Sequence, residues 1–480
     1  MPKLNSQKFY ALSALALFNF VFLGSEFHYD IEIGKLVGPG GVVAAQGVIL
    51  GASVVGFLGY AAAERLLRGA LGRARTALAG ALAAGCLLAI RPLGSAAAVQ
   101  AAGAACFLAL GLMGAAAHAA FSCAFAGEGR IASAAGCSYA AGILMQFANN
   151  MLVPQGFLES IVLCVGLVAL AACLMWALGS GRAVNDAEGT ADTETPGQPL
   201  ARALWSVVLV VILACTFPTL DGVVTVANAE GTYAVQTWPR LFLAASGLAS
   251  GIALDTRGGR YRGPIMFCVA LLSVLSILAV EAGAPPLIGL VVFYLGSGCF
   301  VTFFTTLFVT LAPGMRAPEL WAGMGRAANN ACAFTIAGAS MAVVEMGPVA
   351  VMIASVLLVV VASVAFLKAG LFGLPGDEAA TATPAGPTPQ ERKQAFIDRA
   401  GLTPRETEVL LAVTCDDRPL KQIAADLGIS MRMVQRHLTS IYAKTSTQSR
   451  TGLTSKFLSQ GINAANEQGS GTCSHVQREA

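Results

Sequence analysis

Basic, amide and hydroxyl side chains recur on one face of a short segment near the end of the chain, between Ser430 and Lys444. Such side chains bind phosphate oxygens and base edges; Arg suits guanine and Gln suits adenine because both pairings are bidentate. No carboxylate occurs between Ser430 and Lys456, so the segment favours a polyanion. Lys444 is expected to meet a phosphate. The residues that we predict to contact the polyanion are Ser430, Arg432, Met433, Gln435, Arg436, Thr439 and Lys444.

This segment belongs to a predicted helix-turn-helix. Leu420 to Leu427 predicts a short helix that ends at Gly428, and Ser430 is a good N-cap for a second helix. The second helix of such a motif enters the major groove of DNA. Its inward-facing apolar residues are expected to be Val434, Leu438 and Ile441. The residues expected to read bases are Gln435, Arg436 and Thr439.

A further helix precedes the motif and begins with three signals at once. Thr403 is a hydroxyl N-cap, Pro404 takes the first helical position, and Glu406 lies three residues after the cap. We predict that this helix runs to about Cys415, where polar residues and a proline break the chain.

The whole stretch resembles the DNA-binding domain of the LuxR family. The matching residues are Leu402-Thr403-Pro404-Arg405-Glu406, Glu408-Val409-Leu410, Ile423-Ala424, Leu427, Ile429-Ser430, Val434, His437, Ile441-Tyr442, Lys444 and Ser449-Arg450. The resemblance implies a four-helix module that binds double-stranded DNA, commonly as a homodimer through its last helix, here about Ser449 to Gln460. The chain departs from the family pattern at Met433, Gln435, Asp416 to Pro419 and Thr445-Ser446. Two alternatives are a helical bundle with a solvated basic face and a helix-turn-helix that binds protein.

Composition places most of the chain in a membrane. The 480 residues are 56% hydrophobic and 12% charged, whereas soluble proteins carry about 25% charged residues. Apolar stretches long enough to cross a bilayer are expected at Phe9 to Leu23, Leu36 to Ala63, Thr76 to Ile90, Ala96 to Phe121, Ile131 to Val153, Ser160 to Leu178, Ala203 to Leu220, Trp238 to Leu254, Pro264 to Val280, Leu287 to Leu311, Leu320 to Val344 and Pro348 to Phe372. The fold class is therefore all-α, with about twelve transmembrane helices in two six-helix bundles, followed by the four-helix domain.

The charged loops predict the orientation of these spans. With the N-terminus in the cytoplasm, the inner loops hold Arg65, Arg68, Arg73, Arg75, Arg130, Arg182, Arg202, Arg257, Arg260, Arg262 and Arg316. The outer loops hold Lys35, Arg91, Arg240, Glu26, Asp30, Glu32, Asp221 and Glu230. An excess of Arg on the inner side favours this topology, with both termini in the cytoplasm and the chain in the cytoplasmic membrane.

Polar, proline-rich and alanine-rich stretches divide the chain further. We expect a membrane bundle at 1–178, a cytoplasmic linker at 179–200, a second bundle at 201–372, a linker at 373–390, the DNA-binding domain at 391–462 and a disordered tail at 463–480.

Two loops resemble the Gly-Asp-Arg-Gly-Arg loop of major facilitator superfamily transporters. The copy after the eighth span contains Gly251, Asp255, Arg257, Gly258, Gly259, Arg260 and Arg262. A looser copy after the second span contains Gly59, Glu64, Arg65, Gly72, Arg73 and Arg75. The resemblance implies two pseudo-symmetric six-helix bundles around a central cavity.

Polar residues inside the predicted spans are candidates for a ligand site. The candidate ligand-binding residues are Asn149, Asn150, Arg326, Asn329 and Asn330. An intramembrane charge marks a functional site by default; alternatively, Arg326 extends to the inner interface and the amides join helices. The sequence shows no metal cluster, cofactor motif or catalytic constellation in a plausible context, so we do not predict a metal, a cofactor or an enzyme.

Taken together, these features predict a one-component, membrane-bound transcriptional regulator that senses a small molecule through a transporter-like domain. A transporter with an appended DNA-binding tail is the alternative. A third possibility is a tether between the membrane and a protein or chromosome.

Overall fold

The chain consists of helices packed into two compact units, Met1–Phe372 and Gly373–Ala480. The structure is a computed structural model that describes residues 6–67, 70–185, 198–215, 238–281, 286–371, 396–414, 419–450, 452–454 and 456–457. No strand occurs among these residues. The prediction of an all-α fold is confirmed.

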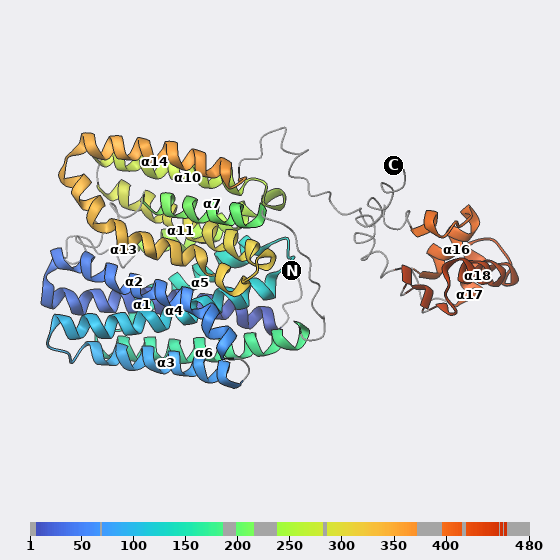
Figure 1. The fold of residues 1–480 in the computed structure, drawn as a ribbon, viewed down its shortest axis with the longest axis horizontal. Helices are drawn as coiled ribbons and strands as arrows, with labels where there is room; N and C mark the ends of the chain where they lie inside the picture. Colours follow the sequence, from blue (N-terminus) through green and yellow to red (C-terminus); the bar gives the residue numbers. More distant parts are fainter. Residues whose placement is uncertain are drawn as a thin grey trace, which may run out of the picture. The chain divides into compact units, whose positions relative to one another are not determined.

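Long helices that run side by side build the first unit (Figure 1). Its first half contains α1 (Ser6–Val37), α2 (Pro39–Leu66), α3 (Ala70–Ile90), α4 (Ala96–Phe125), α5 (Ile131–Leu152) and α6 (Phe157–Asn185). Its second half contains α7 (Gln198–Ala214), α9 (Pro239–Leu254), α10 (Arg262–Glu281), α11 (Pro286–Leu311), the short α12 (Pro318–Trp321), α13 (Met324–Glu345) and α14 (Pro348–Lys368). In the described residues, eight helices are long and apolar enough to cross a membrane, namely α1 to α6, α11 and α14. The total of about twelve spans stays a prediction.

The first helix is longer than the sequence indicated. The apolar run from Phe9 to Leu23 predicted its length, but α1 continues to Val37. Glu26 and Asp30, expected in an outer loop, lie on this helix and accept hydrogen bonds from Gln46 Nε2 at 3.0 and 3.2 Å. Glu32 lies on the helix as well and pairs with Lys35 at 2.7 Å. These polar partners offset the cost of carrying carboxylates on an otherwise apolar helix.

Other predicted boundaries differ less. Helix α6 continues to Asn185, inside the segment expected to be a linker. Arg240, also expected in an outer loop, lies in the first turn of α9 and is buried. The linker at 373–390 and the tail at 463–480 lie outside the described residues.

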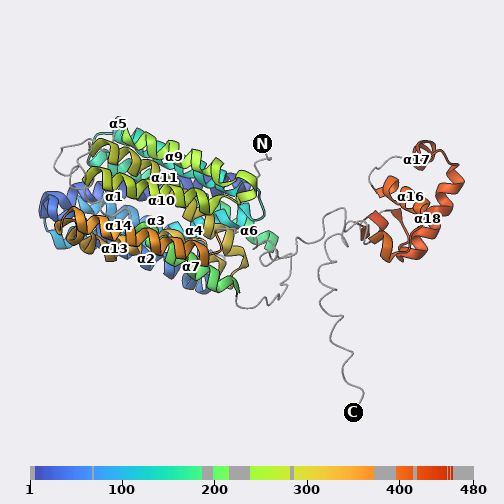
Figure 2. The same cartoon turned by 90° about the horizontal axis from the view of Figure 1, so that it is seen from above.

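The predicted transporter-like loop after the eighth span joins the two halves of the unit. Asp255, at the end of α9, accepts hydrogen bonds from the backbone N–H groups of Ala132 and Ser133 at 3.1 and 2.7 Å. These two residues form the first turn of α5, where free N–H groups favour a negative charge. A second hydrogen bond between the halves runs from Ser122 on α4 to the Val309 carbonyl of α11, at 2.8 Å. In Figure 2, α5, α9 and α11 lie together.

Glycines allow α2 and α4 to approach closely. A Cβ atom on Gly56 would lie 2.1 Å from the Leu108 carbonyl oxygen, and one on Gly111 would lie 2.1 Å from the Ser53 carbonyl oxygen. Both obstacles are backbone atoms, so a side chain there forces the helices apart. Small residues serve membrane helices in this way because packing, rather than the hydrophobic effect, holds them together.

We predict that Gly56→Ala destabilises the membrane unit by about 1 to 3 kcal/mol, the usual cost of overpacking. The matched control is Gly59→Ala on the same helix, where a Cβ atom meets nothing within 4 Å. That variant should change stability by about 1 kcal/mol or less. Thermal unfolding in detergent micelles measures both. Equal effects from the two substitutions would show that the α2–α4 contact does not set stability.

Candidate DNA-binding surface and buried polar cluster

Three helices and short flanking segments pack around one apolar core in the described part of the second unit. The helices are α16 (Pro404–Thr414), α17 (Leu420–Asp426) and α18 (Met431–Thr445). The core residues are Phe396, Ile397, Val409, Leu410, Val413, Ile423, Ala424, Val434, Leu438, Ile441, Leu453 and Phe457. The three helices lie where the sequence placed them.

The start of α16 shows the predicted reciprocal cap. The backbone N–H of Thr403 donates to Glu406 Oε2 at 2.8 Å, and the backbone N–H of Glu406 donates to Thr403 Oγ1 at 3.4 Å. Two N–H groups that the helix leaves unpaired are satisfied in this way. The capping signal read from Thr403 to Glu406 is confirmed.

The turn between α17 and α18 has the geometry of a helix-turn-helix. Gly428 takes a positive φ of 63°, a backbone conformation that favours glycine. Ser430 then caps α18, because its side chain accepts a hydrogen bond from the Met433 N–H at 3.3 Å. The short turn brings α17 and α18 into contact.

Helix α18 has one buried face and one exposed face. Val434, Leu438 and Ile441 are buried, as predicted. The exposed residues include the entire predicted contact set, which is Ser430, Arg432, Met433, Gln435, Arg436, Thr439 and Lys444. Position on the surface makes these side chains available to DNA, while their contacts with DNA stay a prediction.

Lys444 has a partner that the sequence did not reveal. Its ammonium donates to Glu406 Oε2 at 2.7 Å and to the Gly401 carbonyl at 3.0 Å. Ser440 on the same helix donates to Glu406 Oε1 at 2.5 Å. Hydrogen bonds from Lys444, Ser440 and Thr403 hold the pKa of Glu406 at about 2. The cap of α16 therefore also anchors the C-terminal half of α18.

Two residues of the predicted dimerisation segment face the core of their own domain. Leu453 and Phe457 are buried, and the ring of Phe457 meets that of Phe396 edge to face at 5.2 Å. The rest of Ser449 to Gln460 is only partly described. The homodimer stays a prediction.

In the membrane unit, Arg326 is buried rather than extended to an interface. Its side chain is 6% exposed. The guanidinium donates from Nη2 to Asn19 Oδ1 on α1 at 2.9 Å and lies 5.7 and 5.5 Å from the ring centroids of Phe22 and Phe304. Arg326 thus connects α13 with α1 and α11.

The candidate asparagines divide into two kinds. Asn330 joins helices, because its amide donates to Ser53 Oγ on α2 at 2.9 Å, and Asn329 donates to Asn330 Oδ1 at 3.3 Å. Asn150 accepts a hydrogen bond from Gln146 on its own helix at 2.9 Å. Asn149 is buried, and neither polar atom of its side chain has a hydrogen-bond partner in the described part of the chain. The structure therefore does not bring the five candidate residues together through direct contacts.

A buried serine, histidine and glutamate form a polar chain that the sequence analysis did not single out. His28 Nδ1 lies 3.3 Å from Glu159 Oε2, and Ser160 Oγ lies 3.1 Å from His28 Nε2. Hydrolases use such an order of groups to activate serine. Here all three residues are 2% exposed or less, which denies a substrate access to Ser160. We interpret these hydrogen bonds as a link between α1 and α6.

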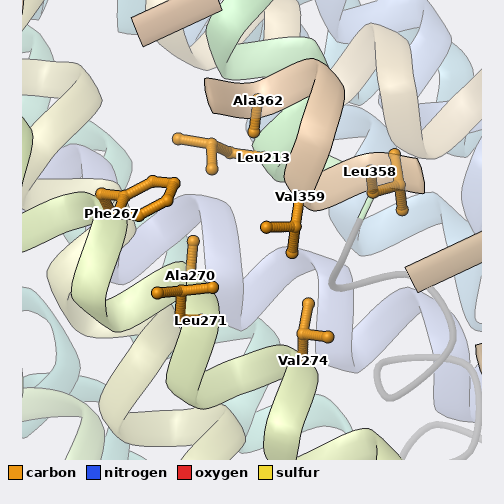
Figure 3. Close-up of a pocket in the computed structure, with 8 residues that line it drawn as sticks. All are labelled: Leu213, Phe267, Ala270, Leu271, Val274, Leu358, Val359 and Ala362. Carbon is orange, nitrogen blue, oxygen red and sulfur yellow. The ribbon is translucent and has the colours of Figure 1, made fainter. Parts of the chain in front are cut away.

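The described residues form an apolar pocket elsewhere, between α7, α10 and α14 (Figure 3). It is lined by Leu213, Phe267, Ala270, Leu271, Val274, Leu358, Val359 and Ala362. Because its lining has no polar side chain, this pocket offers nothing to orient a polar ligand. Among the described residues, no cluster of His, Cys, Asp and Glu could hold a metal ion.

Comparison with protein families identifies the C-terminal domain. Residues 400–457 match the family of bacterial regulatory proteins of the luxR type. The match spans α16, α17 and α18, including the capped start of α16 and the exposed face of α18. No curated protein sequence matches the chain.

Solved structures identify the fold of the membrane unit. The human organic anion transporter MFSD10 (TETRAN) is similar with a TM-score of 0.54, at 12% identity over 77% of this chain and 100% of that chain. The major facilitator superfamily transporter FucP, in the outward conformation, has a TM-score of 0.52 at 12% identity, over 76% of this chain and 99% of that chain. An outward-facing bacterial homologue of the iron transporter ferroportin has a TM-score of 0.54 at 12% identity, over 76% of this chain and 99% of that chain. These likenesses show the fold alone.

Glu406 predicts how the C-terminal domain responds to acid. The pKa of Glu406 in the folded domain is about 2, below the ordinary value of about 4.3. The ionised carboxylate therefore stabilises the fold fully above pH ~4.3, and this stabilisation is lost as the pH falls towards 2. Glu406→Gln should cost about 1 to 2 kcal/mol at neutral pH and flatten this acid dependence. The measurement is urea unfolding of residues 391–462 across this pH range.

The control is Glu408→Gln, which removes a carboxylate that is 50% exposed and pairs with Arg405 on the surface. Exposed pairs contribute little, so this variant should keep the acid dependence of the parent. An unchanged acid response in Glu406→Gln would contradict the proposed role of the Glu406 cap.

Proposed function

We propose that this chain is a membrane-bound, one-component transcriptional regulator that senses a small molecule. Two parts support the proposal: a LuxR-type helix-turn-helix domain at 400–457 and a multi-pass membrane unit with the major facilitator fold. The observation that carries it is the exposed face of α18, which has basic and amide side chains and lies in one chain with helices long enough to cross a bilayer. Neither the matched family nor the matched fold is that of an enzyme.

The partners follow from these two parts. Double-stranded DNA would bind α18, the bilayer would surround the membrane unit, and two copies would meet on DNA through Ser449 to Gln460. The arginine-rich inner loops favour a chain in the cytoplasmic membrane with both termini in the cytoplasm. This orientation puts the helix-turn-helix in the compartment that holds DNA.

Sensing requires a ligand with different affinities for two arrangements of the membrane unit, because equal affinity shifts no equilibrium. Polar links between the two halves are suitable elements for such a change. Arg326 bonds to Asn19, Asn330 bonds to Ser53, and Asp255 caps α5. Each link is a discrete hydrogen bond that a rearrangement of the halves would break or keep.

A transporter with a DNA-binding tail is the second candidate. The observation that favours it is the fold of the membrane unit, which is shared with transporters. Uptake by vesicles reconstituted with the full chain distinguishes this function from a sensor that moves no substrate.

Footprinting tests the regulator. The soluble fragment Gln390 to Ala480 and the full chain in lipid discs are each incubated with DNA from around the chain's own gene. We expect the same discrete protected segment from both. Protection without sequence preference would support the tether, and no protection at low salt would refute the regulator.

Arg436 provides a test of base reading. Its side chain is exposed on α18 and has the geometry to bind guanine bidentately. Arg436→Ala should weaken binding to the protected sequence by about 1 to 3 kcal/mol and relax the preference at one base pair. The control, Arg405→Ala, removes an exposed arginine from α16 that pairs with Glu408. An equal loss on every DNA sequence would assign Arg436 to a phosphate instead.

A further inference from the structure

Two buried arginines of the membrane unit have no carboxylate partner among the described residues. Arg326 on α13 is 6% exposed and Arg240 on α9 is 8% exposed. Neither forms an ion pair with any residue in the described part of the chain, and the Nε atom of each is buried without a hydrogen-bond acceptor. Buried charges in proteins are normally paired, because removal from water costs several kcal/mol per ion.

The surroundings of Arg326 compensate its charge only in part. The amide oxygen of Asn19 accepts one hydrogen bond, and the rings of Phe22 and Phe304 face the guanidinium. These are neutral groups. No ion pair joins Glu26 to Arg326 among the described residues, and Gln46 donates a hydrogen bond to the Glu26 carboxylate at 3.0 Å.

Helix α5 contacts both the partner of Arg326 and the helix that carries Arg240. A Cβ atom on Gly142 of α5 would lie 2.7 Å from the Cβ atom of Asn19, the residue that binds Arg326. Tyr139 of α5 packs against α9, since a Cβ atom on Gly247 would lie 2.6 Å from its ring. Helix α9, which carries Arg240, and the Arg326–Asn19 pair therefore both lie beside α5, where the two halves of the unit meet.

We propose that Arg326 and Arg240 bind the anionic group, a carboxylate or a phosphate ester, of the small molecule that the membrane unit recognises. The inference rests on the proposed sensing function and adds the chemical class of the ligand. An anion supplies the missing countercharge and acceptors for the unpaired Nε–H groups. The apolar pocket of α7, α10 and α14 has no cation and is excluded as the anion site.

Binding of simple anions to the full chain tests the proposal without DNA. The protein is placed in discs of zwitterionic lipid, and unfolding is followed by tryptophan fluorescence on heating with benzoate or phenyl phosphate at millimolar concentration. Benzamide and phenol are the uncharged counterparts. We expect at least one anion to raise the unfolding midpoint saturably, since a ligand that binds the folded state stabilises it. Neither uncharged compound should do so.

The substitutions Arg326→Gln and Arg240→Gln should each lower the affinity for the anion that stabilises the parent by about 30-fold or more. The control Arg65→Gln removes an arginine with a 58% exposed side chain that pairs with Glu319, and it should bind as the parent does. Arg240→Gln tests the site independently if Arg326→Gln fails to fold. A lower midpoint without ligand but a full response to anion would assign both arginines to structure alone and overturn the proposal.

Two further outcomes would overturn it. One is a parent protein that responds to neither anion. The other is stabilisation only in discs that contain anionic lipid, which would assign the arginines to a lipid headgroup. Footprinting separates these failures from failure of the proposed function, because the regulator can bind DNA with a ligand of another class. If an anion binds but never alters the footprint, the anion site stands and the proposed sensing function is refuted.

Discussion

The hydrocarbon core of a bilayer offers no hydrogen bonds, and this constraint governs the membrane unit. Every backbone group there needs a partner within the protein, which helices provide within one segment. Polar side chains must find theirs on neighbouring helices. Asn330 reaches Ser53, Arg326 reaches Asn19, and Asp255 reaches the first turn of α5. Apolar surface cannot choose between neighbouring helices and lipid, so these few polar contacts help to fix which helices meet.

The C-terminal unit meets the opposite constraint, because water competes for its polar groups. Its stability comes from one apolar core to which all three described helices contribute. The same core holds α18 by its buried residues and leaves the other face of the helix exposed. A second anchor comes from Glu406, which joins the start of α16 to Ser440 and Lys444. Helix α18 is thus fixed by an apolar contact and by a network of hydrogen bonds.

The sequence predicted the features that depend on local pattern. Helix starts at Thr403 and Ser430, the glycine turn at Gly428 and the inward face of α18 follow from capping, backbone freedom and helical period, and all are present. The all-α class and the two kinds of unit follow from composition. The long α1 was missed because Glu26 and other carboxylates interrupt the apolar run, and their partners come from elsewhere in the chain.

Contacts between distant residues were beyond prediction. Nothing in the spacing of Glu406 and Lys444 shows that they meet, although each was noticed for another reason. The burial of Arg240 was missed because a charge at the start of an apolar run looks like a loop residue. Arg326 was found, yet its partner Asn19 lies 307 residues away along the chain. Pairing of this kind depends on how the helices pack, which local pattern does not encode.

The contact between Lys444 and Glu406 bears on how DNA binding would respond to salt. A protein cation that neutralises a DNA phosphate releases a condensed counterion, and the number released sets the slope of affinity against salt concentration. Lys444 is already neutralised within its own domain. For it to meet a phosphate, one ion pair must be exchanged for another, and Glu406 is left to attract a cation from solution. The affinity for DNA should therefore fall less steeply with salt concentration than the number of basic side chains on α18 would suggest.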